Sequence, residues 1–162
     1  RLQPVCGRME VFTAPGKPTV VVDYAHTPDG LEKALIALKK SCKGRLICVF
    51  GCGGNRDRNR RFEMGKAAME TADFIIVTSD NPRREDPGKI IEDITDVMKF
   101  CDKVILAIPD RKKAIQRAIA EGRRGDIIVI AGKGHETYQI IGNETRHFDD
   151  REVILSCRED RK

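Results

Sequence analysis

Three residues, Asp80, Asn81 and Arg83, form a short polar cluster that could bind a small charged molecule. They lie in the stretch 78–83, directly after the apolar run 74–77. A carboxylate accepts hydrogen bonds from an ammonium group, a guanidinium can pair with a carboxylate through two parallel bonds, and an amide can donate or accept. This combination suits a ligand that carries both an amine and a carboxylate.

Two prolines predict the local structure around this cluster. Pro82 lacks the N–H that a strand ladder needs, so a strand at 74–77 must end before it. Asp86 is a typical N-cap and Pro87 a typical first helical residue, so a helix is predicted to begin there. The cluster is therefore expected in a loop at the carboxyl end of a strand, which is where open α/β sheets bind ligands.

Comparable polar clusters follow three other apolar runs. They are DYAH at 23–26, GCGGNR at 51–56 and AGKGHE at 131–136. Parallel strands bring their carboxyl ends to the same edge of a sheet, so all four clusters should open on one edge. A ligand-binding edge explains such a set better than a solvated surface does.

Apolar runs alternate along the chain with segments of helical periodicity. Strands are predicted at 19–22, 46–50, 74–77, 104–107 and 127–130, after a short extended segment at 9–13. Helices are predicted from 28 to about 43, 61–71, 87–99, 111–121 and from about 150, and a hairpin at 138–141 and 145–148. This order predicts an α/β, Rossmann-like fold with a mostly parallel sheet, helices on both faces and a C-terminal β-hairpin.

Composition restricts the class of protein. The 162 residues, 40% hydrophobic and 34% charged, are consistent with a single globular domain over 1–162. No segment is long and apolar enough to cross a membrane, and the start lacks both a signal-peptide pattern and an initiator methionine, so we interpret it as a cut inside a longer protein. The net charge of +5 favours anionic small ligands over nucleic acid.

The six cysteines are scattered and include no CxxC pair, which favours reduced thiols in a cytoplasm. The nearest pair, Cys48 and Cys52, is not predicted to bind a metal, and the cysteines are expected to fill the core. A P-loop is also missing, because Gly-Lys is followed by Pro18, Ala67, Ile90 or Gly134 instead of Ser or Thr. The chain can therefore contribute to a nucleotide site but is not predicted to hold a triphosphate alone.

The four clusters, in this order, resemble the C-terminal domain of the Mur ligases. The matching segments are DYAHTPDGLEKAL, FGCGGNRDRNRR, TSDNPR and AGKGHETYQ, and the resemblance covers about residues 7–155. Members of this family have three domains: one for a UDP sugar, a central ATPase domain that carries the P-loop, and this one. The resemblance implies that the chain is the third domain, with the N-terminal and central domains as its partners.

The resemblance also implies a reaction. ATP with Mg²⁺, bound mainly by the central domain, would phosphorylate the D-glutamyl carboxylate of UDP-N-acetylmuramoyl-L-alanyl-D-glutamate. The amine of an incoming amino acid would then attack the acyl phosphate and form an amide in peptidoglycan synthesis. This domain would bind the amino acid and close over ATP. No catalytic residue is expected in the chain, which should be inactive alone.

In this family, the motif DNPR is typical of members that add meso-2,6-diaminopimelate. An arginine can grip the carboxylate by which diaminopimelate differs from lysine. The resemblance implies that diaminopimelate contacts Arg56, Asp80, Asn81, Pro82, Arg83, Gly132 and Glu136. It implies that Asp23 and His26 lie near ATP. Arg111, at a helix start, is not included in the site.

Other interpretations remain open from the residues alone. The chain could be a non-catalytic module that binds an amino acid or a nucleotide. Nucleic-acid binding through the arginines at 56–61 is weaker, because the chain has only six Phe and two Tyr and no binding motif. Asp80 could merely satisfy loop amides, and His26 could be structural. A solvated face is the expectation for Arg58, Arg60 and Arg61.

Overall fold

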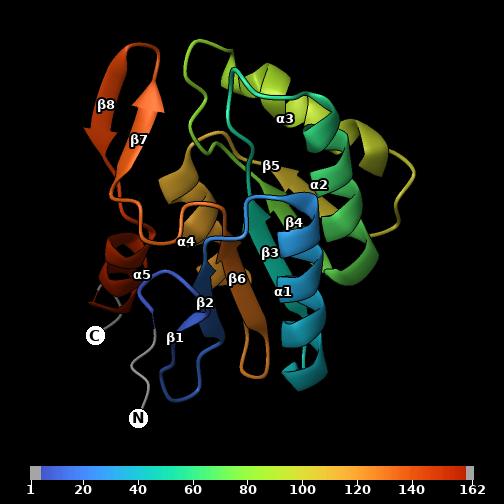
Figure 1. Cartoon of the computed structure of the whole chain (residues 1–162). Coiled ribbons are helices and arrows are strands. Elements are labelled where there is room, and N and C mark those ends of the chain that lie inside the picture. Colours follow the sequence, from blue (N-terminus) through green and yellow to red (C-terminus); the bar gives the residue numbers. More distant parts are fainter. Residues whose placement is uncertain (1–4, 160–162) are drawn as a thin grey trace.

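A six-stranded β-sheet forms the centre of the molecule (Figure 1). The computed structural model describes residues 5–159. The strands of the sheet are β1 (Glu10–Phe12), β2 (Thr19–Asp23), β3 (Leu46–Phe50), β4 (Phe74–Val77), β5 (Val104–Ala107) and β6 (Ile127–Ala131). Their order across the sheet is β1-β2-β6-β3-β4-β5. β1 is antiparallel to β2 and the other neighbours are parallel, which confirms the predicted fold class.

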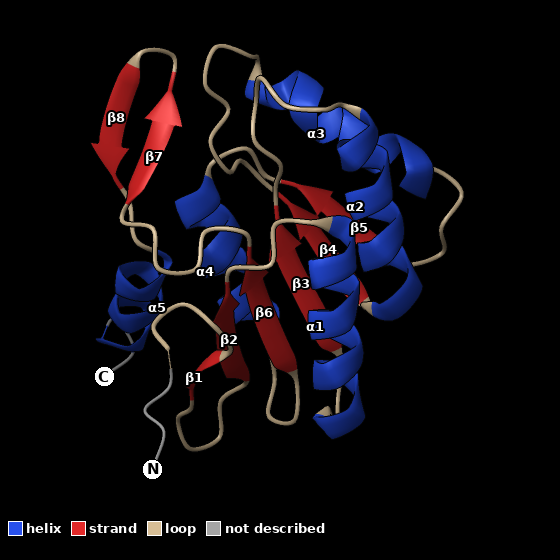
Figure 2. Cartoon of the chain, viewed as in Figure 1, coloured by secondary structure: helices blue, strands red, loops and turns tan. Residues whose placement is uncertain are grey.

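Helices cover both faces of this sheet (Figure 2). They are α1 (Pro28–Ser41), α2 (Asn59–Thr71), α3 (Pro87–Thr95), α4 (Arg111–Glu121) and α5 (Asp150–Glu159). The first three pack on one face, and α4 and α5 pack on the other. A 3₁₀ turn, η1 (Asp96–Met98), replaces the last turn of the helix predicted to reach 99.

Short polar side chains begin three of the helices where their strands have ended. Thr27 accepts a hydrogen bond from Gly30 N, Asp86 from Gly88 N and Asp110 from Lys113 N. Each cap satisfies an N–H group that has no partner inside its helix. The loops between these strands and caps hold their polar residues at the carboxyl edge of the sheet.

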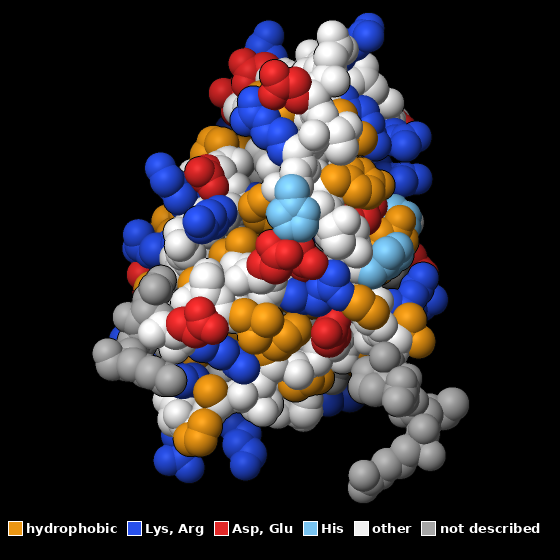
Figure 3. Space-filling model, turned by 90° about the vertical axis from the view of Figure 1, so that its left-hand side faces the viewer, with side chains coloured by type: hydrophobic (Ala, Val, Ile, Leu, Met, Phe, Trp, Pro, Cys, Tyr) orange, Lys and Arg blue, Asp and Glu red, His pale blue; other side chains and the backbone are white. Residues whose placement is uncertain are grey.

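A two-stranded hairpin stands apart from the main sheet. It consists of β7 (Tyr138–Ile141) and β8 (Glu144–His147), which pair antiparallel. The turn passes through Gly142, whose φ of +60° suits glycine. Residues of β8 are exposed throughout. Figure 3 shows the face on this side of the molecule, where acidic and basic side chains are interspersed with apolar ones.

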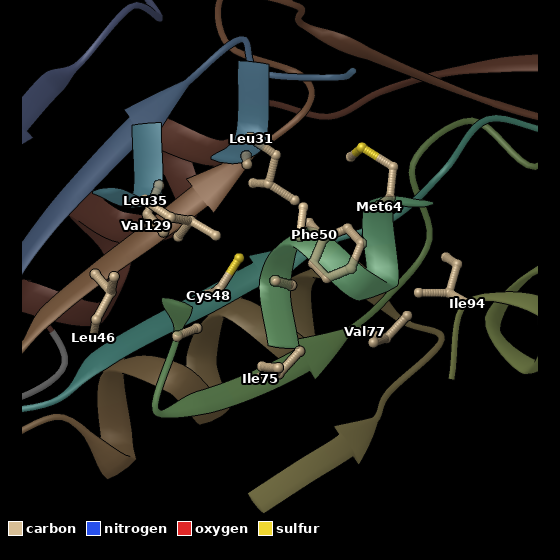
Figure 4. Packing of buried hydrophobic residues seen from close by; sticks show 14 of the residues in the cluster. Leu31, Leu35, Leu46, Cys48, Phe50, Met64, Ile75, Val77, Ile94 and Val129 are labelled. Carbon is tan, nitrogen blue, oxygen red and sulfur yellow. The ribbon is translucent and has the colours of Figure 1, made fainter. Parts of the chain in front are cut away.

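Alternate residues of each central strand point into two separate apolar cores. In β3, Cys48 and Phe50 join the core under α1, α2 and α3, whereas Ile47 and Val49 join the core under α4 and α5. Figure 4 shows part of the first core, where Phe50 lies among side chains of neighbouring strands and helices. Burying one such side chain stabilises a fold by about 1.5–3 kcal/mol. The sheet is thus rigid where its loops begin.

The predicted elements are all present, with shifted ends. α2 begins at Asn59, earlier than the predicted 61, and β8 covers 144–147 where 145–148 was predicted. Within residues 5–159, no helix is both long and apolar enough to cross a lipid bilayer.

Candidate functional site

A pocket of about 380 Å³ opens at the carboxyl edge of the sheet. It is lined by residues that follow β2, β3, β4 and β6, so the four polar clusters meet there. Six of the residues expected to contact an amino acid line it: Arg56, Asp80, Asn81, Arg83, Gly132 and Glu136. His26, expected near ATP, lines it as well. The structure therefore brings together side chains that are far apart in the sequence.

Two of the expected site residues do not line the pocket. The carboxylate of Asp23 accepts hydrogen bonds from Ala25 N (2.8 Å) and Met9 N (2.9 Å), so it orders the chain after β2. Pro82 packs its backbone against Gly54, where an added Cβ would come within 1.8 Å of Pro82 O. Both residues shape the loops around the pocket.

The loop that carries Asp80 to Arg83 is paired with β7 of the hairpin. Arg83 N donates to Ile140 O (3.0 Å), and Arg83 O accepts from Gly142 N (2.6 Å). Gln139 Nε2 donates to Asp80 O (2.8 Å) from a buried position. The sequence analysis did not include Gln139 in the site. A hydrogen bond from its side-chain amide to a backbone oxygen far away in the sequence cannot be recognised from residue types or spacing. The hairpin thus sets the position of this loop.

The guanidinium of Arg83 lies against the glycines that follow β3. Its Nη1 donates to Gly54 O (2.9 Å), and a Cβ on Gly53 would approach the same atom to 2.8 Å. Only a residue without a side chain leaves room for the guanidinium at this position. The glycine-rich loop and Arg83 are therefore fitted to each other.

A second residue missed in the sequence analysis, Lys133, lies beneath the pocket with no exposed surface. Its Nζ is 3.1 Å from Asn81 Oδ1, 3.2 Å from Glu136 Oε2 and 3.8 Å from Asp80 Oδ1. A signal was available, because a lysine between two glycines after a buried strand has little room to reach solvent. It connects three residues of the expected site.

The prediction that Arg61 belongs to a solvated face is wrong. Its side chain is 1% exposed, and it forms ion pairs with Glu85 (2.8 Å) and Asp93 (2.9 Å). The hydrogen bond from Arg61, together with that from Asn55 N, lowers the pKa of Glu85. Arg61, in the first turn of α2, therefore faces Asp93 of α3 and Glu85, which lies just before α3. Arg58 and Arg60 are exposed as expected, and Arg60 lines the pocket.

Arg111 is buried in an ion pair away from the pocket lining. Its Nε and Nη2 donate to the two carboxylate oxygens of Asp150, each at 2.8 Å. Its remaining bonds reach Ser79 O (3.3 Å) and Ala131 O (3.2 Å) at the ends of β4 and β6. Burial disfavours the charge, but Asp150 outweighs it and raises the pKa of Arg111. The pair holds together two loops that contribute to the pocket.

The cysteines nearest to the pocket are protonated. Burial raises the pKa of Cys48 and of Cys52 to about 12 in each case. A thiol with such a pKa is a poor nucleophile and a poor metal ligand at neutral pH. Among residues 5–159, no three or more His, Cys, Asp or Glu side chains group in a way that would hold a metal ion.

Comparison with known proteins identifies the family. The profile described as "Mur ligase, glutamate ligase domain" matches residues 7–134. This chain belongs to the Mur ligase family. Together with its fold and motif order, this match makes it a Mur ligase C-terminal domain.

Individual Mur ligases resemble the chain closely. It is 56% identical over 154 residues to UDP-N-acetylmuramoyl-L-alanyl-D-glutamate--2,6-diaminopimelate ligase of Haemophilus influenzae, covering 95% of this chain and 31% of that protein. A solved structure of a ligase with the same name superposes with a TM-score of 0.91 at 43% identity, over 98% of this chain and 32% of the other. The chain therefore spans about a third of the length of these Mur ligases.

A more distant structure shares the fold. The Thermotoga maritima MurF ligase in complex with ADP superposes with a TM-score of 0.60 at 21% identity, over 83% of this chain and 29% of that one. At this identity the likeness concerns the fold alone. Mur ligases of different names thus use the same arrangement of sheet and helices.

Proposed function

We propose that residues 1–162 form one domain, the C-terminal domain of a cytoplasmic, ATP-dependent, amide-forming ligase. The enzyme adds meso-2,6-diaminopimelate to UDP-N-acetylmuramoyl-L-alanyl-D-glutamate in peptidoglycan synthesis. This domain binds diaminopimelate and closes over ATP, and by itself it is inactive. The observation that carries the proposal is one pocket that combines Arg56 and Arg83 with Asp80 and Glu136. The 56% identity to a diaminopimelate ligase supports the same substrate.

The charges in the pocket match diaminopimelate better than lysine. Diaminopimelate is lysine with a second carboxylate, which a guanidinium such as that of Arg83 can bind through two parallel hydrogen bonds. Lysine would leave this charge without a partner, and an unsatisfied charged donor costs about 1–3 kcal/mol or more. That difference corresponds to about tenfold to over a hundredfold in discrimination. The carboxylates of Asp80 and Glu136 are suited to accept from an ammonium group.

The nucleotide part of the proposal rests on the loop after β2. His26 lines the outer part of the pocket, and its ring lies 4.6 Å from that of Tyr24. We assign His26 to the edge that faces ATP, and Asp23 to ordering the loop that carries it. ATP and Mg²⁺ would be held mainly by the central domain, so this chain, which has the N-terminal and central domains as its partners, supplies none of their principal ligands.

Calorimetry on the full-length enzyme tests the choice of substrate. With a non-hydrolysable ATP analogue and the UDP-linked precursor present, meso-diaminopimelate should bind at least about tenfold more tightly than L-lysine. Arg83→Ala should remove most of that preference while leaving the affinity for the ATP analogue unchanged. Arg84→Ala is the matched control, because it deletes the same charge from an exposed neighbour of Arg83. Equal affinity for the two amino acids in the unmodified enzyme would contradict the proposal.

A further inference from the structure

The buried ammonium of Lys133 contacts three side chains of the proposed amino-acid site and no solvent. Its Nζ donates to Asn81 Oδ1 (3.1 Å) and Glu136 Oε2 (3.2 Å) and pairs with Asp80 Oδ1 (3.8 Å). The Tyr138 ring lies 5.6 Å from the same nitrogen. A lysine with no exposed surface is rare unless it is paired, and here its partners are the pocket residues themselves.

The bonds to Asn81 determine which way its amide faces. Oδ1 accepts from Lys133 Nζ and also from Ile140 N (3.0 Å), so both of its acceptor positions are occupied. If the Asn81 amide were flipped, its NH₂ group would face two other donors, Lys133 Nζ and Ile140 N. A ligand that reaches Asn81 through the pocket therefore meets the Nδ2 donor, which suits a carboxylate and not an ammonium.

The same lysine changes the charge that the ligand meets. Asp80 and Glu136 bring two carboxylates to one pocket, and Lys133 Nζ lies 3.8 Å from Asp80 Oδ1 and 3.2 Å from Glu136 Oε2. Lys133 cancels one of the two charges, which leaves one negative charge for a ligand ammonium to neutralise.

We propose that Lys133 is a positioning residue for the amino-acid pocket. It fixes Asn81 with its amide NH₂ towards a ligand carboxylate and holds Asp80 and Glu136 as an acceptor pair for a ligand ammonium. The inference rests on the proposed function, since it gives a role to a residue behind that same site. It predicts that Lys133 acts on the amino acid and not on the nucleotide.

Steady-state kinetics of the full-length ligase with Lys133→Met test this role. The KM for diaminopimelate should rise at least about tenfold, while the KM for ATP stays within about threefold. Lys103→Met is the matched control, because the Lys103 ammonium also donates to two acceptors of the protein, Met69 O and Ala72 O, and these belong to residues outside the pocket lining. If the role of Lys133 were only structural, Lys133→Met and Lys103→Met would both lower the stability of the protein, and neither would change the KM for diaminopimelate selectively.

A second variant tests the orientation of Asn81 without removing the lysine. In Asn81→Asp, both carboxylate oxygens accept, so the bonds from Lys133 and Ile140 N can remain, and the donor towards the ligand is replaced by an acceptor that carries a negative charge. The KM for diaminopimelate should rise at least about tenfold with an unchanged melting temperature. An unchanged or lower KM would mean that Asn81 offers an oxygen to the ligand, which overturns the inference even where Lys133→Met is unstable.

The two proposals fail in different ways. If the unmodified ligase does not prefer diaminopimelate to lysine, the proposed function is wrong. If it does prefer diaminopimelate, and both Lys133→Met and Lys103→Met leave the KM for diaminopimelate within about twofold of the unmodified value, the substrate stands and the role of Lys133 is wrong.

Discussion

Arg83 joins an uncommon backbone conformation to a charged side chain. Its φ of 55° lies in the left-handed region, which residues other than glycine seldom adopt. Bonds from Arg83 N to Ile140 O and from Gly142 N to Arg83 O hold it there. The residue types around Arg83 were enough to predict a polar loop at the carboxyl end of a strand. Its conformation could not be predicted, because the hydrogen-bond partners lie far along the chain.

The glycines opposite Arg83 give a prediction at this scale. In Gly53→Ala, the new Cβ would lie 2.8 Å from Arg83 Nη1, the mobile end of a long side chain. We expect the guanidinium to shift, so the KM for diaminopimelate should rise severalfold while the melting temperature changes little. Enzyme kinetics and thermal denaturation of the full-length ligase check both parts. A large loss of stability in Gly53→Ala would contradict the expectation that only the guanidinium of Arg83 moves.

Gly54→Ala provides the contrast. There a Cβ would come within 1.8 Å of the backbone oxygen of Pro82, which cannot move without its loop. Overpacking of this kind costs about 1–3 kcal/mol or more. The free energy of unfolding should therefore fall clearly in this variant and not in Gly53→Ala, and denaturant titration measures the difference.

At the scale of elements, the hairpin β7–β8 acts as a brace for the loop at 78–83. The hairpin itself was predictable from two short alternating segments around a glycine. The contact between the hairpin and the loop at 78–83 was not predictable. The sequence of two antiparallel strands does not indicate which third segment will bind beside them. Arg61 illustrates the same limit. A run of arginines does not reveal which of them a helix will turn towards Glu85 and Asp93.

Gln139→Leu tests the brace. The change keeps the volume of the side chain but removes the donor to Asp80 O, so a buried carbonyl loses its partner. The free energy of unfolding should fall by about 1–3 kcal/mol, and diaminopimelate should bind more weakly. Arg146→Ala on β8 is the control, because its ion pair with Glu144 is exposed and contributes about 0–1 kcal/mol. Unchanged binding in Gln139→Leu would argue against a brace.

At the scale of the whole molecule, the buried pair of Arg111 and Asp150 connects α4 and α5 to the ends of β4 and β6. Breaking such a pair by removing one partner costs about 3–5 kcal/mol. We therefore expect Asp150→Ala to lower the free energy of unfolding by about that amount, as measured by denaturant titration. Asp110→Ala, which removes only a helix cap, should cost about 1 kcal/mol.

Stability should also depend on pH through Asp126. Burial by itself would raise the pKa of Asp126, but hydrogen bonds from Arg45 N, Arg123 N and the Arg45 guanidinium lower it overall. A carboxyl whose pKa is lower in the folded state stabilises the fold above the unfolded pKa, near 4, and loses this effect as the pH falls. The melting temperature should therefore fall when the pH is lowered below about 4. Asp126→Asn should reduce that dependence, and an unchanged pH profile would exclude Asp126 as a source.

The attachment of Arg83 to the hairpin through its main chain has a consequence for how such an enzyme can diverge. Because the N–H and the C=O carry the attachment, the path of the polypeptide there does not depend on the identity of the side chain. A residue that accepts the left-handed conformation, such as asparagine or glycine, can therefore replace arginine and keep these main-chain bonds, although the bond to Gly54 O is lost. If Arg83 has the role proposed for it, a change in one codon would alter which building block is selected, while the main-chain framework around it is inherited.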